Sequence, residues 1–150
     1  MKPVTIISNS LFSYVTGDLS ALEYWRGRVK DSAYARATEI DYIYVLFREL
    51  AARRFTYTPD LAEIENFTSS PKPLFENGVI LHDDAGLLIR FALGEDGLVG
   101  HLSLVQRAAV EMRLCVYLYR ETNISEDELQ LLLVQVERAV ARDFPELEPE

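Results

Sequence analysis

The clearest pattern of apolar and polar positions lies in the last third of the chain. Apolar residues recur there at three- and four-residue steps, the spacing of one helix face. They are Leu129, Leu132, Leu133, Val136, Ala139 and Val140. Ser125 and Glu128 form a capping box in front of them, and Phe144-Pro145 follows them. The sequence therefore predicts a helix that begins after Ser125 and stops before Phe144.

Helical spacing also predicts three helices in the first half of the chain. A capping box at 20–23 opens a short helix. A longer helix is expected over 32–54, and Pro59 begins a third one that runs to Phe67. The apolar face of the long helix consists of Ile40, Ile43, Tyr44, Phe47, Leu50 and Ala51.

The period changes to two after Asn77-Gly78, and a period of two is typical of strands. Glycine and aspartate in 83–86 and 94–97 favour tight turns, because they tolerate the positive φ that such turns need. A short apolar run at 4–7 is predicted to be a strand as well. The main strands are predicted at 79–82, 87–93, 98–106 and 110–120.

Residues 102–119 fit two interpretations. They can be written as a helix whose face holds Val105, Ala108, Met112, Cys115 and Tyr119. The β-branched and aromatic run at 116–119 favours a strand. We therefore predict a strand and keep the helix as the alternative.

These elements predict a two-layer α+β domain. An antiparallel four-stranded meander over about 79–120 is expected to be covered by the N-terminal helices and the C-terminal helix. The 150 residues contain no internal repeat and no long linker, so a single domain over 1–150 is expected, with 146–150 as a loose tail.

Charge changes the picture of the surface. The net charge is −9, yet residues 1–54 sum to +2, with eight basic and six acidic side chains. Residues 121–150 hold nine acids against Arg138 and Arg142. Nucleic acids require a cationic surface, so this balance argues against nucleic-acid binding and against anionic membranes. It favours a basic protein partner.

The expected compartment is the cytoplasm. Lys2 and the apolar run at 4–7 resemble the start of a secretion signal, but Ser8 to Ser10 interrupt the run and no cleavage site follows. No apolar stretch reaches the roughly 20 residues that span a bilayer. Cys115 is the only cysteine, so an intrachain disulfide is impossible.

Candidate catalytic chemistry is sparse. The chain has no phosphate-binding glycine loop, and no cofactor is expected. The nearest reactive cluster is His82-Asp83-Asp84, which with His101 could bind a divalent metal. An acidic turn explains His82-Asp83-Asp84 as well, because turns select aspartate for local backbone hydrogen bonds, and we favour the turn.

The candidate partner-binding residues combine acids and tyrosines, since interfaces concentrate tyrosine and a basic partner would seek carboxylates. The outer face of the predicted sheet, with its arginines and tyrosines, could also stack the bases of a single strand, although the charge opposes this. An exposed strand edge or helix face could support a homodimer. The partner-binding candidates are Glu126, Asp127, Glu128, Glu137, Asp143, Tyr117 and Tyr119.

Two classes of function follow from these observations. The favoured hypothesis is a non-catalytic acidic protein-binding module, of the inhibitor or immunity type or of the secretion-chaperone type, that binds a basic protein. The alternative is a small hydrolase, or a metal- or ligand-binding domain, that uses His82, Asp83, Asp84 and His101. No motif is specific enough to identify a family.

Overall fold

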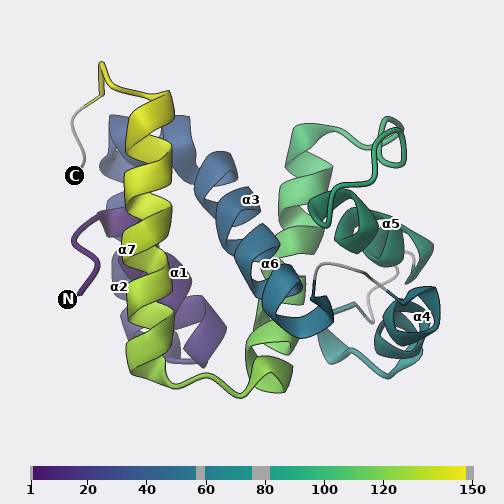
Figure 1. Cartoon of the computed structure of the whole chain (residues 1–150). Coiled ribbons are helices and arrows are strands. Elements are labelled where there is room, and N and C mark those ends of the chain that lie inside the picture. Colours follow the sequence, from purple (N-terminus) through teal and green to yellow (C-terminus); the bar gives the residue numbers. More distant parts are fainter. Residues whose placement is uncertain (1, 57–59, 76–81, 148–150) are drawn as a thin grey trace. The chain divides into compact units, whose positions relative to one another are not determined.

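The computed structural model describes residues 2–56, 60–75 and 82–147 (Figure 1). These residues form seven α-helices and one short 3-10 helix, and none of them lies in a strand. No helix in these ranges has the length and apolarity needed to cross a membrane. The elements are α1 (Ile6–Thr16), α2 (Leu19–Asp31), α3 (Ala33–Phe55), α4 (Leu61–Ser69), η1 (Pro73–Phe75), α5 (His82–Ala92), α6 (Leu104–Thr122) and α7 (Glu126–Asp143).

The chain divides into two compact units, which we describe separately. The first contains Met1–Leu46 and Asn123–Glu150, and the second contains Phe47–Thr122. The boundary falls inside α3 and again just after α6. The expectation of a single domain stays a prediction.

The prediction of an α+β fold with a four-stranded sheet is wrong, beginning with the strand expected at 4–7. That segment leads into α1. The hydroxyl of Thr5 accepts a hydrogen bond from the Ser8 N–H and caps the helix, and Gly17 ends it in the left-handed conformation with φ 82°. Capping by Thr5 therefore turns a short apolar run into the first turn of a helix.

The strand expected at 87–93 is also helical and belongs to α5. Leu87, Ile89, Phe91 and Leu93 alternate, but the residues buried in α5 follow a different period. Those are Ala85, Leu88, Ile89 and Ala92, which recur at three- and four-residue steps. The strand expected at 79–82 lies outside the described residues except for His82, which begins α5.

The strand expected at 110–120 and the last three residues of the strand expected at 98–106 belong to α6, so the helical alternative for 102–119 is the correct one from Leu104 onward. Residues 98–103 contain bends and a turn, and none of them lies in a strand. Ser103 and Gln106 form a reciprocal capping box: each backbone N–H donates to the side chain of the other residue. Residues 114–118 of this helix are all buried, and this unbroken stretch hides the 3.6-residue period. Its buried residues are Ala108, Val110, Glu111, Leu114, Cys115, Val116, Tyr117 and Leu118.

The helices predicted in the first half and at the C-terminus are confirmed as α2, α3, α4 and α7. Their ends depart little from the expected ones. Asp18, rather than Ser20, caps α2 by accepting a hydrogen bond from the Ala21 N–H. Asp60 caps α4 in the same way. Ser125 caps α7 as predicted.

In the first unit, α1 packs against both α2 and α7 (Figure 1). Ile7 and Leu11 of α1 are buried, and so are Leu129, Leu132 and Val136 of α7. Each such side chain contributes about 1.5–3 kcal/mol when it leaves water. This packing, more than intrinsic helix propensity, stabilises the helices.

In the second unit, α5 packs against α4 and α6 (Figure 1). The rings of Phe55 and Phe67 meet edge to face with centroids 5.5 Å apart. The turn predicted at 94–97 has the expected positive φ values, 110° at Gly94 and 80° at Gly97. It ends α5 instead of joining two strands, because the Gly94 and Glu95 N–H groups donate to the last carbonyls of that helix.

Candidate partner-binding surface

The first turn of α7 carries three exposed acids, Glu126, Asp127 and Glu128. The Ser125 hydroxyl accepts a hydrogen bond from the Glu128 N–H at 3.1 Å. Carboxylates in this position stabilise a helix because they lie beside the positive end of its dipole. None of the three acids forms an ion pair with another described residue, so their charge faces solvent.

Glu137, another predicted partner-binding residue, has an internal role. Its carboxylate accepts hydrogen bonds from the Thr5 N–H at 2.7 Å and the Val4 N–H at 3.0 Å. It therefore satisfies backbone donors at the start of α1, where no helical carbonyl is available. Asp143 at the end of α7 is exposed. Burial, and to a lesser degree the charge of Asp143, raises the pKa of Asp41.

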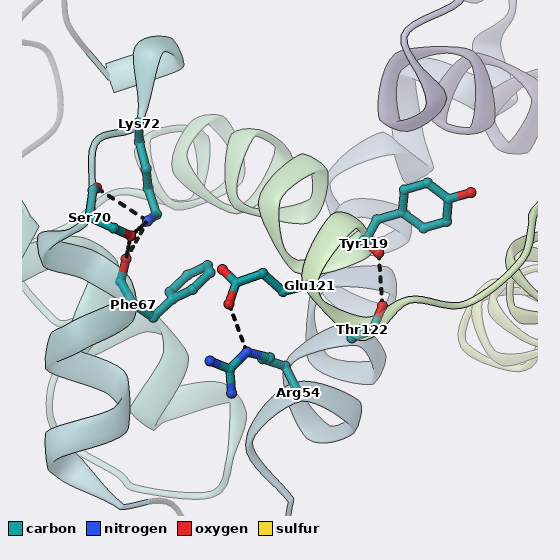
Figure 2. Close-up of polar contacts among 7 residues, drawn as sticks. All are labelled: Arg54, Phe67, Ser70, Lys72, Tyr119, Glu121 and Thr122. Carbon is teal, nitrogen blue, oxygen red and sulfur yellow. Dashed lines mark hydrogen bonds and ion pairs between the residues drawn. The ribbon is translucent and has the colours of Figure 1, made fainter.

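The two candidate tyrosines belong to the second unit. Tyr117 is buried, and its hydroxyl accepts a hydrogen bond from the Leu74 N–H at 2.8 Å. Tyr119 is half-buried, and its backbone carbonyl accepts a hydrogen bond from the Thr122 hydroxyl at 3.0 Å (Figure 2). Tyr117 is thus engaged in packing and offers little surface to a partner.

The structure brings two members of the candidate metal cluster together. Nε2 of His101 lies 2.9 Å from Oδ1 of Asp84, where their side chains are 51% and 19% exposed. The side chains of His82 and Asp83 lie outside the described part of the structure. Among the described residues, no group of three or more histidine, cysteine, aspartate or glutamate side chains is arranged to hold a metal.

Lys72 forms a cluster that the sequence did not indicate. Its side chain is buried, with 5% of the residue exposed. The ammonium donates to the Phe67 carbonyl, in the last turn of α4, and to the hydroxyl of Ser70, which follows that helix (Figure 2). It also lies over the Phe67 ring, 4.1 Å from the centroid. Burial lowers the pKa of Lys72, and the charge of Glu121 opposes this shift.

Glu121 is neutralised inside the second unit. Its Oε1 lies 3.0 Å from Nε of Arg54, so α3 and α6 are joined by an ion pair (Figure 2). Lys72 lies between Pro71 and Pro73, and no sequence signal marks it as buried. Glu121 was counted among the nine acids of residues 121–150, but its charge is paired with Arg54. The unpaired acids of this part of the chain therefore all follow Glu121.

Glu111 and Cys115 are two further buried titratable groups, one helical turn apart on α6. Burial raises the pKa of Glu111 to about 7, although the charge of Arg107 lowers it. Burial, with the charge of Glu111 as a second cause, raises the pKa of the Cys115 thiol well above its ordinary value. The thiol therefore stays protonated and is a poor nucleophile. The four-residue spacing from Arg107 through Glu111 to Cys115 indicates a shared face once the segment is recognised as helical.

Comparison with known proteins does not assign a family: no family model, no curated protein and no solved structure matches this chain.

Proposed function

We propose that this is a non-catalytic protein that binds a basic protein partner through the exposed acids of α7. Such proteins include inhibitors or immunity proteins and secretion chaperones. The supporting observation is the charge of the first unit, whose sequence has thirteen acidic and seven basic side chains. Eight of these acids lie in 123–150, so the surplus is concentrated at α7 and the residues after it.

The set of proposed contact residues is smaller than the set predicted from the sequence. Glu137 is engaged with the start of α1, and Tyr117 is buried. The exposed carboxylates of α7 carry the proposal: Glu126, Asp127, Glu128 and Asp143. A field of this sign accelerates encounter with a basic partner and weakens as salt rises.

The test uses the full tagged chain, expressed in its native cell and purified with its partners at low and high salt. Binding of the recovered partner is then measured for a triple variant, Glu126→Gln, Asp127→Asn and Asp143→Asn. Glu128 is kept because it belongs to the capping box. We expect a slower association rate, by about tenfold at low salt, because the steering charge is removed.

The matched control neutralises three exposed acids elsewhere, with Glu23→Gln, Asp31→Asn and Asp96→Asn. It makes the same change in net charge and should leave the association rate within about twofold. Recovery of no basic protein at any salt concentration, or equal losses in both triple variants, would contradict the proposal.

A second candidate function rests on the contact between Asp84 and His101. Carboxylate and imidazole are suitable ligands for a divalent metal, and the pair is partly open to solvent. Zinc, manganese and magnesium are added in turn while the melting temperature is followed. A metal site predicts a rise that His101→Ala and Asp84→Asn each abolish. An unchanged melting temperature with all three metals removes the metal-binding form of this candidate.

A further inference from the structure

Glu111 is a buried carboxyl group without a partner for its charge. The residue is 2% exposed and belongs to α6. Neither an ion pair nor a hydrogen bond to another described residue holds its carboxyl group. Burial raises the pKa of Glu111 to about 7, so the group changes charge near neutral pH.

Arg107 lies four residues before Glu111, and side chains at this spacing are neighbours on a helix. Its guanidinium is nevertheless directed to the backbone ahead of α6. Nη2 donates to the Val99 carbonyl at 2.9 Å, and Nε donates to the Leu102 carbonyl at 3.2 Å. The guanidinium also lies over the ring of Phe91, 5.8 Å from the centroid. Arg107 is therefore the cation beside Glu111 but is not paired with it.

Residues 97–103, which we call the Arg107 loop, precede α6 and depend on this side chain. The Val99 carbonyl accepts one hydrogen bond from Arg107 and another from the Leu102 N–H, at 3.0 Å. Val99 is buried, whereas Gly100 and His101 are exposed. Without the guanidinium, the carbonyls of Val99 and Leu102 lose the donor that holds them to the first turns of α6. The loop is then free to move away from the helix.

The two sets of acceptors for Arg107 differ in what happens when they are left unpaired. A carboxylate that is buried without a partner is costly, because it has lost its water and gained no opposite charge. The carbonyls of an exposed loop can bind water once they are released. A guanidinium and a carboxylate can also form two parallel hydrogen bonds between opposite charges. Ionisation of Glu111 therefore favours transfer of Arg107 from the loop to the carboxylate.

We propose that α6 contains a pH-sensitive switch, in which Arg107 holds the Arg107 loop while Glu111 is neutral and pairs with Glu111 once that carboxyl group is ionised. The loop is released in the second state. Arg107 is the charged side chain that acts on Glu111 in the described part of the chain, and no charged group of another element contributes. The Cys115 thiol, one turn further along α6, stays protonated and neutral. The switch lies in the second unit and goes beyond the binding function proposed for α7.

The test measures hydrogen exchange at the Leu102 N–H of the full chain by NMR, at pH 6 and at pH 8. The rate is expressed as a protection factor, which corrects for the pH dependence of exchange itself. Glu111 is about one-tenth ionised at pH 6 and about nine-tenths ionised at pH 8. If the loop opens whenever Glu111 is ionised, the protection factor should fall about tenfold between the two pH values.

Two variants assign the effect to Glu111 and Arg107. Glu111→Gln keeps the size of the side chain and cannot ionise, so the protection factor should stay high at both pH values. Arg107→Met removes the donor, so the protection factor should be low at both. Circular dichroism shows whether Arg107→Met folds, and the comparison of the wild type with Glu111→Gln decides the question if it does not.

The matched control is His101→Gln, because His101 lies in the Arg107 loop and histidine also titrates near neutral pH. Its side chain contacts Asp84 of α5, so its charge could move the loop for a different reason. The tenfold fall should persist in His101→Gln. A fall that disappears in His101→Gln and persists in Glu111→Gln would overturn the proposal.

An equal protection factor at pH 6 and pH 8 in the wild type would also overturn it, even if the free energy of unfolding depends on Glu111. In that case the carboxyl group is desolvated but Arg107 does not change its acceptors. Neither result bears on the α7 acids, whose role is measured by the association rate of a partner. Failure of the switch and failure of the proposed function are therefore distinguishable.

Discussion

Glu111 is a carboxyl group among the buried residues of α6, with 2% of the residue exposed. Its folded-state pKa of about 7 lies above its ordinary value of 4.5, chiefly because burial disfavours the charged form. A carboxyl with a raised pKa binds its proton more tightly in the folded state. Its influence on stability is therefore most favourable below pH 4.5, declines between pH 4.5 and about 7, and is constant above.

We predict that Glu111→Gln removes most of this pH dependence. The wild type should lose up to about 3 kcal/mol between pH 4.5 and pH 8 from this group, because one pKa unit corresponds to about 1.4 kcal/mol. The glutamine variant should be the more stable protein at pH 8. Urea unfolding at both pH values measures the difference, with the exposed Glu23→Gln as control. Parallel pH profiles for wild type and Glu111→Gln would show that Glu111 is not desolvated as described.

Lys72 differs from Glu111, because the cost of burying its charge is compensated by nearby hydrogen-bond acceptors and aromatic rings. Replacing it by methionine keeps the length of the side chain but leaves the Phe67 carbonyl and the Ser70 hydroxyl without this donor. It also removes the cation from the Phe67 ring. We predict a loss of about 2 kcal/mol in the free energy of unfolding. Lys30→Met, at an exposed position of α2, should change it by less than about 0.5 kcal/mol. A more stable Lys72→Met would mean that the cost of desolvating the charge exceeds these contacts.

At the scale of the element, the stability of α5 depends on two glycines, one inside the helix and one just after it. Gly86 is inside α5, where glycine is a poor helix former. Gly94 follows the same helix with φ 110° and has open space around it. The two positions therefore test helix propensity and backbone strain within a few residues of each other.

We predict opposite signs for the two alanine substitutions. Gly86→Ala should stabilise the protein by up to about 1 kcal/mol, because the new methyl group meets Ile64 and Thr68 at ordinary contact distance. Gly94→Ala should destabilise it by about 1–2 kcal/mol, because alanine rarely adopts a positive φ. Thermal and urea unfolding measure both effects. Stabilisation by Gly94→Ala would contradict the left-handed end of α5.

Elements also show which predictions the sequence could support. For α7 the apolar spacing, the Ser125 cap and the terminal proline agree, and the helix was predicted with nearly correct ends. In α5 and α6 the apolar residues can be grouped at a period of two or at a period of 3.6, and the two groupings have largely different members. The capping box at Ser103 and Gln106 was the local signal that could have favoured a helix. The aromatic and β-branched run at 116–119 outweighed it, although β propensity depends strongly on packing context.

At the scale of the whole molecule, the charge is unevenly divided between the two units. The first unit carries a sequence charge of −6 and the second −3, and together they account for the net −9. Within the second unit, Arg54 and Arg90 each pair with a glutamate. The exposed acids of α7 have no such partners among the described residues. Eight of the thirteen acids of the first unit lie in 123–150, which is why the binding proposal is placed on α7.

The fold of the whole chain gives a direct prediction. The far-ultraviolet circular dichroism spectrum should be that of a predominantly helical protein, because the described residues contain helices and no strand. The predicted four-stranded meander would instead add a substantial strand contribution. Measurement in dilute buffer distinguishes the two, and a spectrum with marked strand character would contradict the all-helical fold.

Sequence by itself determined the features that arise from neighbours in the chain. These are the helices with clear caps, the positive φ at Gly94 and Gly97, and the surplus of acid after Asn123. Only the tertiary structure decided the state of residues 82–120, because their apolar positions can be grouped at a period of two as well as at a period of 3.6. It alone decided that Glu137 accepts hydrogen bonds from the N–H groups of Val4 and Thr5 ahead of α1, and that Asp84 meets His101. Such contacts depend on how segments distant in the sequence pack together, and the spacing of neighbouring residues does not predict this packing.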